Sequence, residues 1–198
     1  MFTGIIQNLG EIINFSNGEL QISTHLDLSD CNIGSSISCD GVCLTVTDIK
    51  LKNNKYIFTV KVSEETQSRT NYSNEQIYQL KKINLEKSLK IGDEISGHFV
   101  YGHVDRTTKL NKIKVLQNSW EFYFDKFQNQ DSKFIVEKAS IAVNGISLTI
   151  AKVEKLYFSI SVIPHTFENT NLKYLKESNI VNIEFDYLAR FSEKDLSK

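Results

Sequence analysis

A nine-residue phrase occurs twice in this chain of 198 residues. It reads SCDGVCLTV at Ser38–Val46 and AVNGISLTI at Ala142–Ile150, and its glycine, leucine and threonine coincide at a shift of 104 positions. One position differs in its chemistry, because Cys43 of the first copy corresponds to Ser147 of the second. The chain therefore carries two related segments with different nucleophile-type side chains.

The similarity extends through most of both halves. The matched segments are Phe58–Val62 with Phe158–Val162, Thr66–Asn71 with Thr166–Asn171, Ile83–Glu86 with Val181–Glu184, and Phe2–Ile5 with Val100–His103. Two copies of about ninety residues indicate a tandem duplication, because a solenoid needs shorter and more numerous repeats.

Within each half the pattern favours β-structure. Tyr56–Val62 and Leu156–Val162 alternate apolar and polar side chains with period two, and Trp120–Phe124 is a further strand candidate. Helices are expected to be short, with Ser63 as the N-cap of one and Pro164 in the first turn of its counterpart. Several short antiparallel strands in each half predict a closed barrel, which leaves no open edge.

The expected organisation is two barrels followed by a helix. We expect the first barrel over residues 1–90 and the second over 97–186, joined by the connection Leu89–Asp93. Residues 187–198 have good helix formers and apolar side chains at helical spacing. A helix this short is unstable alone in water, so it either packs on the barrels or meets the same helix in other subunits.

Charge and composition exclude several classes of function. The formal net charge is -1, so no basic surface for nucleic acid is expected. No run of about 18 apolar residues occurs and the first residues lack a basic n-region, so we expect neither a membrane span nor a signal peptide. Three cysteines, an odd number, favour a reducing cytoplasm over an oxidising compartment.

No metal site is predicted. If Cys39 and Cys43 share one strand, their sulfurs lie roughly 13 Å apart, which is too far for one tetrahedral ion. No histidine follows at a ligand spacing.

Each copy of the phrase places two small polar side chains on one face of a strand. Cys43 and Thr45 are two residues apart, as are Ser147 and Thr149, so the members of each pair point the same way. Such a pair can hydrogen-bond a heteroaromatic ring or a polyol. A threonine ladder beside a buried cysteine is the alternative interpretation.

The dipeptides Asp40-Gly41 and Asn144-Gly145 precede these strands. Both are hairpin-turn signals. A glycine in this context also lets a ligand approach the backbone, so each turn is a candidate floor of a binding site.

Two histidines, His98 and His103, lie within Gly97–Asp105. If this stretch is a strand, they face opposite sides and at most one enters a given site. Histidine is the side chain best suited to acid–base chemistry near neutral pH. His25 and His165 lack such a context and are interpreted as structural.

Four motifs occur in a characteristic order: Met1–Ile5, the doubled Gly-x-Cys/Ser-Leu-Thr phrase, Gly97–Asp105, and Ile163–Thr166. Together they resemble the riboflavin synthase family of the α-chain type, from Met1 to about Phe191. The resemblance implies an all-β fold with short helices: two tandem six-stranded Greek-key antiparallel β-barrels plus a C-terminal α-helix, through which three copies form a homotrimer.

The resemblance also implies a reaction. Two molecules of 6,7-dimethyl-8-ribityllumazine dismutate by transfer of a four-carbon unit, which yields riboflavin and 5-amino-6-ribitylaminopyrimidinedione. No cofactor is implied, and each site would lie between the N-barrel of one subunit and the C-barrel of its neighbour. Lumazine synthase is a further candidate partner.

Transferred position by position, the resemblance implies a set of site residues. Catalytic roles fall to His103, Cys43, Ser147 and Asp186. The remaining substrate contacts are Phe2, Gly4, Ser36, Gly41, Thr45, Thr66, Lys138, Asn144, Gly145, Thr149, Ile163 and Thr166. Asn144 and Asp40 exchange the family's usual aspartate and asparagine, and Arg106 replaces a usual glycine; an amide at Asn144 cannot act as a base.

Two other functions stay open. Non-catalytic lumazine proteins share this double barrel and hold the pigment in one half, but they diverge at the reactive positions, whereas Cys43, His103 and Ser147 are present here. An OB-like nucleic-acid module is disfavoured by the near-neutral charge and by the lack of an aromatic–basic stripe.

Overall fold

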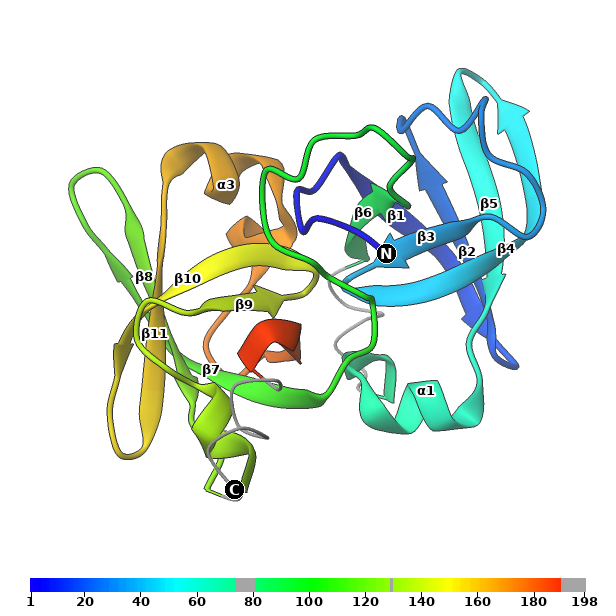
Figure 1. The fold of residues 1–198 in the computed structure, drawn as a ribbon. Coiled ribbons are helices and arrows are strands. Elements are labelled where there is room, and N and C mark those ends of the chain that lie inside the picture. Colours follow the sequence, from blue (N-terminus) through cyan, green and yellow to red (C-terminus); the bar gives the residue numbers. More distant parts are fainter. Residues whose placement is uncertain (74–80, 129, 190–198) are drawn as a thin grey trace.

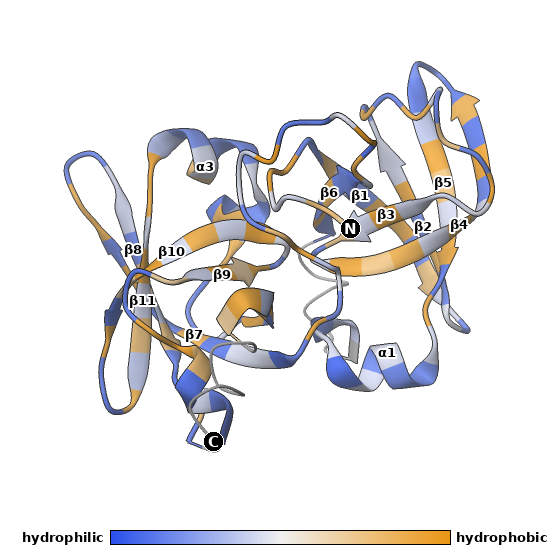
Figure 2. Cartoon of the chain, viewed as in Figure 1, coloured by the Kyte–Doolittle hydropathy of each residue, from blue (hydrophilic) through white to orange (hydrophobic). Residues whose placement is uncertain are grey.

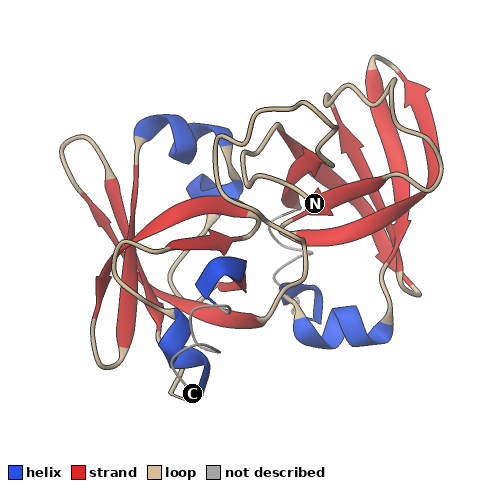
Figure 3. Cartoon of the chain, viewed as in Figure 1, coloured by secondary structure: helices blue, strands red, loops and turns tan. Residues whose placement is uncertain are grey.

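The structure is a computed structural model that describes residues 1–73, 81–128 and 130–189. Strands make up most of its regular structure, and the helices are short (Figure 3). The described strands form two closed six-stranded antiparallel barrels that lie side by side (Figure 1). The prediction of a tandem all-β double barrel is therefore confirmed.

The two barrels have the same strand order. The first contains β1 (Asn8–Ser16), β2 (Glu19–Thr24), β3 (Ser36–Cys39), β4 (Val42–Lys52), β5 (Lys55–Lys61) and β6 (Lys82–Lys87). The second contains β7 (Arg106–Val115), β8 (Trp120–Asp125), β9 (Ser140–Val143), β10 (Ile146–Val153), β11 (Tyr157–Val162) and β12 (Ile180–Phe185). Around the first barrel the order is β1-β2-β5-β4-β3-β6, a Greek key, and the counterpart strands repeat it in the second.

The pairing register shifts at equivalent places in equivalent strands of the two barrels. The register shifts at Ile12/Asn14 in β1 and at Leu110/Lys112 in β7. It also shifts at Val46/Asp48 in β4 and at Ile150/Lys152 in β10. A bulge increases the local twist and lets a strand bend around a closed barrel. The duplication therefore includes the irregularities that close each barrel.

Each barrel encloses its own apolar core. Apolar residues follow the strands of both barrels (Figure 2), and Phe58 and Phe158 occupy equivalent, fully buried positions in β5 and β11. Burying one phenylalanine stabilises the fold by about 1.5–3 kcal/mol. A third cluster contains Phe2, Val100 and Ala142 and draws on both halves.

Short helices follow β5 and β11 at equivalent positions. α1 (Glu64–Arg69) begins after Ser63, whose hydroxyl accepts a hydrogen bond from the Thr66 amide, as the N-cap prediction required. α3 (Pro164–Asn169) has its proline in the first turn, also as predicted. The 3₁₀ turns are η1 (Asn71–Ser73), η2 (Gln130–Phe134) and η3 (Asn171–Tyr174).

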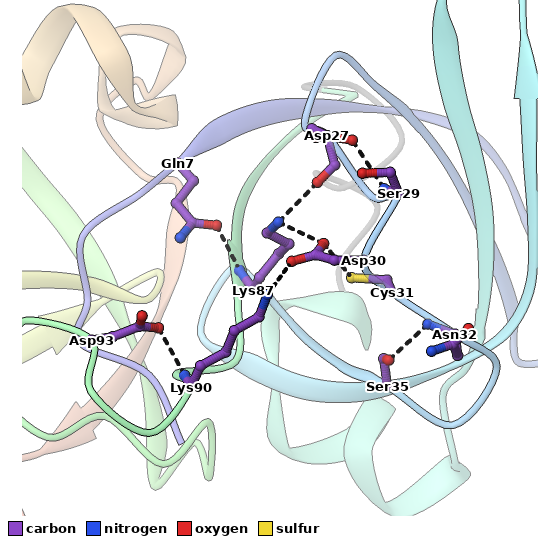
Figure 4. A network of polar contacts seen from close by, with 10 residues as sticks. All are labelled: Gln7, Asp27, Ser29, Asp30, Cys31, Asn32, Ser35, Lys87, Lys90 and Asp93. Atoms are coloured by element: carbon purple, nitrogen blue, oxygen red, sulfur yellow. Dashed lines mark hydrogen bonds and ion pairs between the residues drawn. The ribbon is translucent and has the colours of Figure 1, made fainter.

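A polar cluster ties the loop after β2 to the end of the first barrel (Figure 4). The Asp30 carboxylate lies 2.8 Å from the Lys87 ammonium and also pairs with Lys90. Hydrogen bonds from these two lysines hold the pKa of Asp30 well below its ordinary value. Because the cluster is solvated, we assign it a role in orienting the loop and the connection rather than a large share of stability.

Helical conformation begins at Tyr187 and continues to Ala189, the last described residue. Asp186 caps this turn, since its Oδ1 accepts a hydrogen bond from the Leu188 amide at 3.0 Å. The predicted helix over 187–198 therefore lies mostly outside the described residues. Within the described part of the chain, no helix is long and apolar enough to cross a membrane.

Candidate functional site

The opening segment of each half lies against the barrel of the other half. The Gly4 carbonyl accepts a hydrogen bond from the Ser147 amide at 2.8 Å, and the Gly102 carbonyl accepts one from the Cys43 amide at 2.9 Å. A Cβ at Gly4 would lie 2.6 Å from the Ser147 nitrogen, and one at Gly102 would lie 2.5 Å from the Cys43 Cβ. Both glycines also have positive φ, so crowding and backbone conformation each favour glycine there.

Equivalent residues of the two halves meet between the barrels. Phe2 and Val100 exchange two backbone hydrogen bonds of 2.7 and 3.0 Å. Gly41 and Gly145 also touch, because a Cβ on Gly41 would lie 2.7 Å from the Gly145 nitrogen. An approximate twofold axis therefore relates the halves.

The first half-site is a pocket of about 210 Å³ beside Cys43. Its residues from the first barrel and α1 are Val42, Cys43, Glu65, Thr66, Arg69 and Thr70, and the second half contributes Gly102, His103 and Val104. The opening segment of the second half, which contacts β4 at Gly102, therefore forms one wall of this pocket.

The second half-site is a pocket of about 90 Å³ beside Ser147. Its lining consists of Ile146, Ser147, His165, Thr166, Asn169 and Thr170, together with Gly4, Ile5 and Ile6 from the first half. Each of these positions is the counterpart of one in the first half-site. The duplicated phrase, the following helix and the exchanged segment therefore build two related pockets.

The two half-sites differ in charge. Cys43, Glu65, Arg69 and His103 line the first half-site, where the Arg69 Nε lies 3.2 Å from the Glu65 carboxylate. Their counterparts around Ser147 have other side chains, and an isoleucine, Ile5, replaces the exposed imidazole of His103. The Cys43 half-site is consequently the more charged of the two.

His98 lies beside Ser147, with 2.7 Å between its Nδ1 and the serine Oγ. Burial lowers the pKa of His98, and the Asp186 carboxylate acts in the opposite direction. Among the described residues, its Nε2 is the one buried side-chain polar atom without a hydrogen-bond partner. A neutral imidazole at this distance can exchange a proton with the Ser147 hydroxyl.

Gly97–Asp105 is not a strand, so the condition under which His98 and His103 would face opposite sides of a strand is not met. The segment is a loop with a single bridge at Val100, because its backbone is used to contact the opposite half. His98 and His103 lie beside different half-sites. Both histidines were candidates from the sequence, but the family resemblance assigned a catalytic role to His103 alone, and nothing in the sequence indicated that His98 would meet Ser147.

Cys39 and Cys43 do not share one strand, so the condition used to estimate the distance between their sulfurs is not met. Cys39 ends β3 and Cys43 lies in β4, because Asp40 and Gly41 both have positive φ and form a two-residue turn. All three cysteines are free, and no group of three His, Cys, Asp or Glu side chains within the described residues is arranged to hold a metal ion.

Several predicted contacts lie on the outer face of the barrels. Ser36 pairs across the strands with Thr45, and Thr149 occupies the equivalent place beside Ser140. Thr45 and Thr149 are exposed, next to Cys43 and Ser147 along β4 and β10. Exposed positions also hold Lys138, which has φ +69°, and Ile163, the N-cap of α3.

Other predicted contacts are buried between the barrels. Phe2 is fully buried, and Asn144 is 1% exposed. The Asn144 Oδ1 accepts a hydrogen bond from the Asn182 amide at 2.8 Å, and its backbone carbonyl accepts one from the Asn84 side chain at 3.0 Å. Asn144 therefore holds the barrels together, and it lies outside both pocket linings.

Asp40 occupies the counterpart position and is also buried. Its Oδ1 accepts hydrogen bonds from the Asn84 amide and from the Asn171 side chain, at 2.7 and 2.9 Å. Burial raises the pKa of Asp40 to about 8 despite these donors. We call the buried residues of this interface the polar seam; they are Asp40, Asn71, Asn84, Asn144, Asn171 and Asn182.

The family model for the lumazine binding domain matches residues 3–88 and again residues 101–186. Riboflavin synthase from Brucella abortus is 38% identical over 199 residues, which span 98% of this chain and 97% of that protein. Riboflavin synthase from Bacillus subtilis is 36% identical over 203 residues, which span 100% of this chain and 91% of that protein. The chain belongs to the riboflavin synthase family.

A solved structure shares the double barrel. The crystal structure of LumP complexed with riboflavin has a TM-score of 0.76 and 20% identity, and it covers 93% of this chain and 99% of that one. This likeness concerns the fold. The riboflavin synthase relatives, by contrast, match along the whole sequence and in both lumazine binding domains.

Proposed function

We propose that the protein is a riboflavin synthase that converts two molecules of 6,7-dimethyl-8-ribityllumazine into riboflavin and 5-amino-6-ribitylaminopyrimidinedione. The observation that carries this proposal is the pair of related half-sites, one beside Cys43 and one beside Ser147. A reaction between two identical molecules needs two similar binding sites. Full-length similarity to riboflavin synthases supports the same assignment.

The half-sites are small for complete ligand sites. Their volumes of about 210 and 90 Å³ fall below the roughly 300–1,000 Å³ of typical small-molecule pockets. This supports the proposal that each active site is completed by a neighbouring subunit of a homotrimer, with the N-barrel of one copy facing the C-barrel of the next. Residues 1–90 and 97–186 would be the two substrate domains, and residues 187–198 the trimerisation helix.

The protein's contribution to the reaction is positioning and proton transfer. Holding two reactants in register supplies about 7–11 kcal/mol towards the barrier. The methyl group on C7 of the lumazine is acidic, and its proton must leave before the four-carbon unit is transferred. The hydrogen-bonded pair His98 and Ser147 supports assigning this proton transfer to the C-barrel half-site, and His103 is the candidate at the Cys43 half-site.

The decisive test is incubation of the purified protein with 6,7-dimethyl-8-ribityllumazine without added cofactor. We expect one riboflavin and one pyrimidinedione for every two lumazines consumed, measured by absorbance and chromatography. A folded protein that binds the lumazine without forming riboflavin would instead be a pigment carrier. Such a carrier would bind one ligand per chain, whereas the synthase binds two.

The trimer is tested by removing the residues after Asp186. We expect monomers with little activity, measured by sedimentation and by riboflavin formation, because each site spans two subunits. A fully active monomer would contradict the shared site.

The three free thiols support a reducing location such as the cytoplasm.

A further inference from the structure

Two buried glutamates hold the exchanged opening segments. Glu86 is the fifth residue of β6, and Glu184 is the fifth residue of β12; they are 2% and 6% exposed. Among the described residues, neither carboxylate takes part in an ion pair. Burial raises the pKa of both carboxyl groups.

Backbone amides of the opening segments donate to these carboxylates. Glu86 accepts hydrogen bonds from the Thr3 amide at 2.7 Å, the Thr3 hydroxyl at 2.8 Å and the Gly4 amide at 3.0 Å. Glu184 accepts from the amides of Tyr101, Gly102 and His103 at 2.6, 2.9 and 3.0 Å. Hydrogen bonds to a charged acceptor are stronger than neutral ones, so each carboxylate fixes the path of its segment.

The next contact in each chain of interactions crosses to the other barrel. Glu86 holds Gly4, whose carbonyl accepts from the Ser147 amide in β10. Glu184 holds Gly102, whose carbonyl accepts from the Cys43 amide in β4. Each glutamate therefore supports the half-site that belongs to the opposite barrel.

We propose that Glu86 and Glu184 are positioning residues connected crosswise, so that Glu86 sets the geometry and ligand affinity of the Ser147 half-site, and Glu184 those of the Cys43 half-site. The part that concerns ligand affinity rests on the proposed function. The part that concerns geometry does not, because the hydrogen bonds join protein atoms alone.

Hydrogen exchange of two amides tests the geometry directly. Glu184→Gln replaces one carboxylate oxygen by an NH₂ group, which cannot accept a hydrogen bond from the backbone amides, and it removes the charge from the remaining acceptor. The segment Tyr101–His103, which includes Gly102, is therefore held less firmly. We expect exchange of the Cys43 amide to become about tenfold faster, since one hydrogen bond contributes about that factor, while the Ser147 amide keeps its rate. Glu86→Gln should produce the reverse pattern.

Milder and matched variants keep the test decisive if a glutamine variant folds poorly. Thr3→Val removes the hydroxyl that donates to Glu86 and that accepts a longer hydrogen bond from the Ile5 amide, and it keeps the Thr3 backbone donor. It should therefore speed exchange at Ser147 and not at Cys43. Glu11→Gln, at an exposed site on β1, removes the same charge and should change neither amide. If hydrogen exchange becomes faster at the amide in the same barrel as the substituted glutamate, or equally at both amides, the crosswise connection is wrong.

Titration with riboflavin, followed by its fluorescence, then tests affinity. The unmodified protein should bind two equivalents per chain, and each glutamine variant should weaken one of the two binding steps at least tenfold. If both riboflavin-binding steps keep their affinity in both variants, the two glutamates do not control ligand affinity. If the crossed exchange pattern appears but no riboflavin forms from lumazine in the unmodified protein, the positioning role stands and the proposed function fails.

Discussion

Phe2 and Val100 hydrogen-bond to each other through both backbone groups, although they are equivalent residues of the two halves. Phe2 is fully buried against Ala142 of β9, the residue that pairs across the strands with Ser147 of β10. Phe2 therefore lies buried between the two halves, close to the start of the chain. It fixes where Gly4 meets the second barrel.

Phe2→Ala should destabilise the protein by about 3–5 kcal/mol, because it leaves a cavity between the barrels that the surroundings cannot fill. Riboflavin formation should fall as Gly4 loses its anchor. Denaturant unfolding measures the first effect and turnover the second. Phe99→Ala is the control: Phe99 is 39% exposed, so its removal should change stability by much less. Equal effects of the two substitutions would show that Phe2 is not an anchor.

Asp40→Asn should stabilise the protein, increasingly so as the pH rises. The folded-state pKa of about 8 exceeds the ordinary value, so the stability linked to neutral Asp40 is fully present below about pH 4 and is lost as the pH rises to about 8. The nearby Cys39 and Tyr72 stay neutral, because burial raises the pKa of both. Asn144 shows that an asparagine fits the counterpart position.

Thermal unfolding at several pH values, at fixed protein concentration, measures this gain. It should be near zero at pH 4 and reach at most about 6 kcal/mol above pH 8. Asp48→Asn is the control: this exposed carboxylate pairs with Lys50, so its loss should not stabilise. A gain for Asp40→Asn that is independent of pH would contradict a buried neutral acid.

Gly102→Ala should disable the Cys43 half-site. Gly102 and Gly92 both have positive φ, but a Cβ at Gly102 meets Cys43 at 2.5 Å, whereas one at Gly92 meets no atom within 4 Å. Gly92→Ala should therefore cost only the backbone strain of about 1–2 kcal/mol. Gly102→Ala adds overpacking of about 1–3 kcal/mol and should weaken one riboflavin-binding step. Matching results for the two variants would show that the close approach is unimportant.

His98→Gln should lower kcat by about 10²–10⁴-fold if the imidazole transfers a proton through Ser147. Burial lowers the pKa of His98, so the base should stay neutral, and activity high, until the pH falls below the ordinary value of about 6.5. The acidic limb of the kcat profile should disappear in the variant. His103→Gln is the comparison, because His103 lines the other half-site. A variant at His98 that keeps both rate and profile would remove it from the mechanism.

The repeated segments and their alternating pattern were sufficient to predict two barrels, because strand alternation and turn dipeptides act locally, whereas the six-stranded Greek-key arrangement was implied by the family resemblance. The same dipeptides, Asp40-Gly41 and Asn144-Gly145, form the turns between β3 and β4 and between β9 and β10. The pairing of Gly4 with Ser147 was not predictable. It depends on how two barrels pack, and no local pattern specifies which strand receives a distant carbonyl.

Glu86 and Glu184 escaped sequence reasoning for a related reason. Each follows an apolar residue in a repeated Asn-x-Glu pattern, which resembles the solvated end of an alternating strand. The donors that satisfy these carboxylates are backbone amides about 80 residues away. The one available signal was that the same two polar residues recur in both copies.

The exchange of opening segments also constrains how the two halves can diverge. A side chain added at position 4 must be accommodated at position 147, and one added at position 102 must be accommodated at position 43. A substitution in one copy of the duplication is therefore retained only if it is compatible with the sequence of the other copy. Across related sequences, covariation should connect these positions between the barrels, so that the two copies evolve as one unit even while their pockets acquire different chemistry.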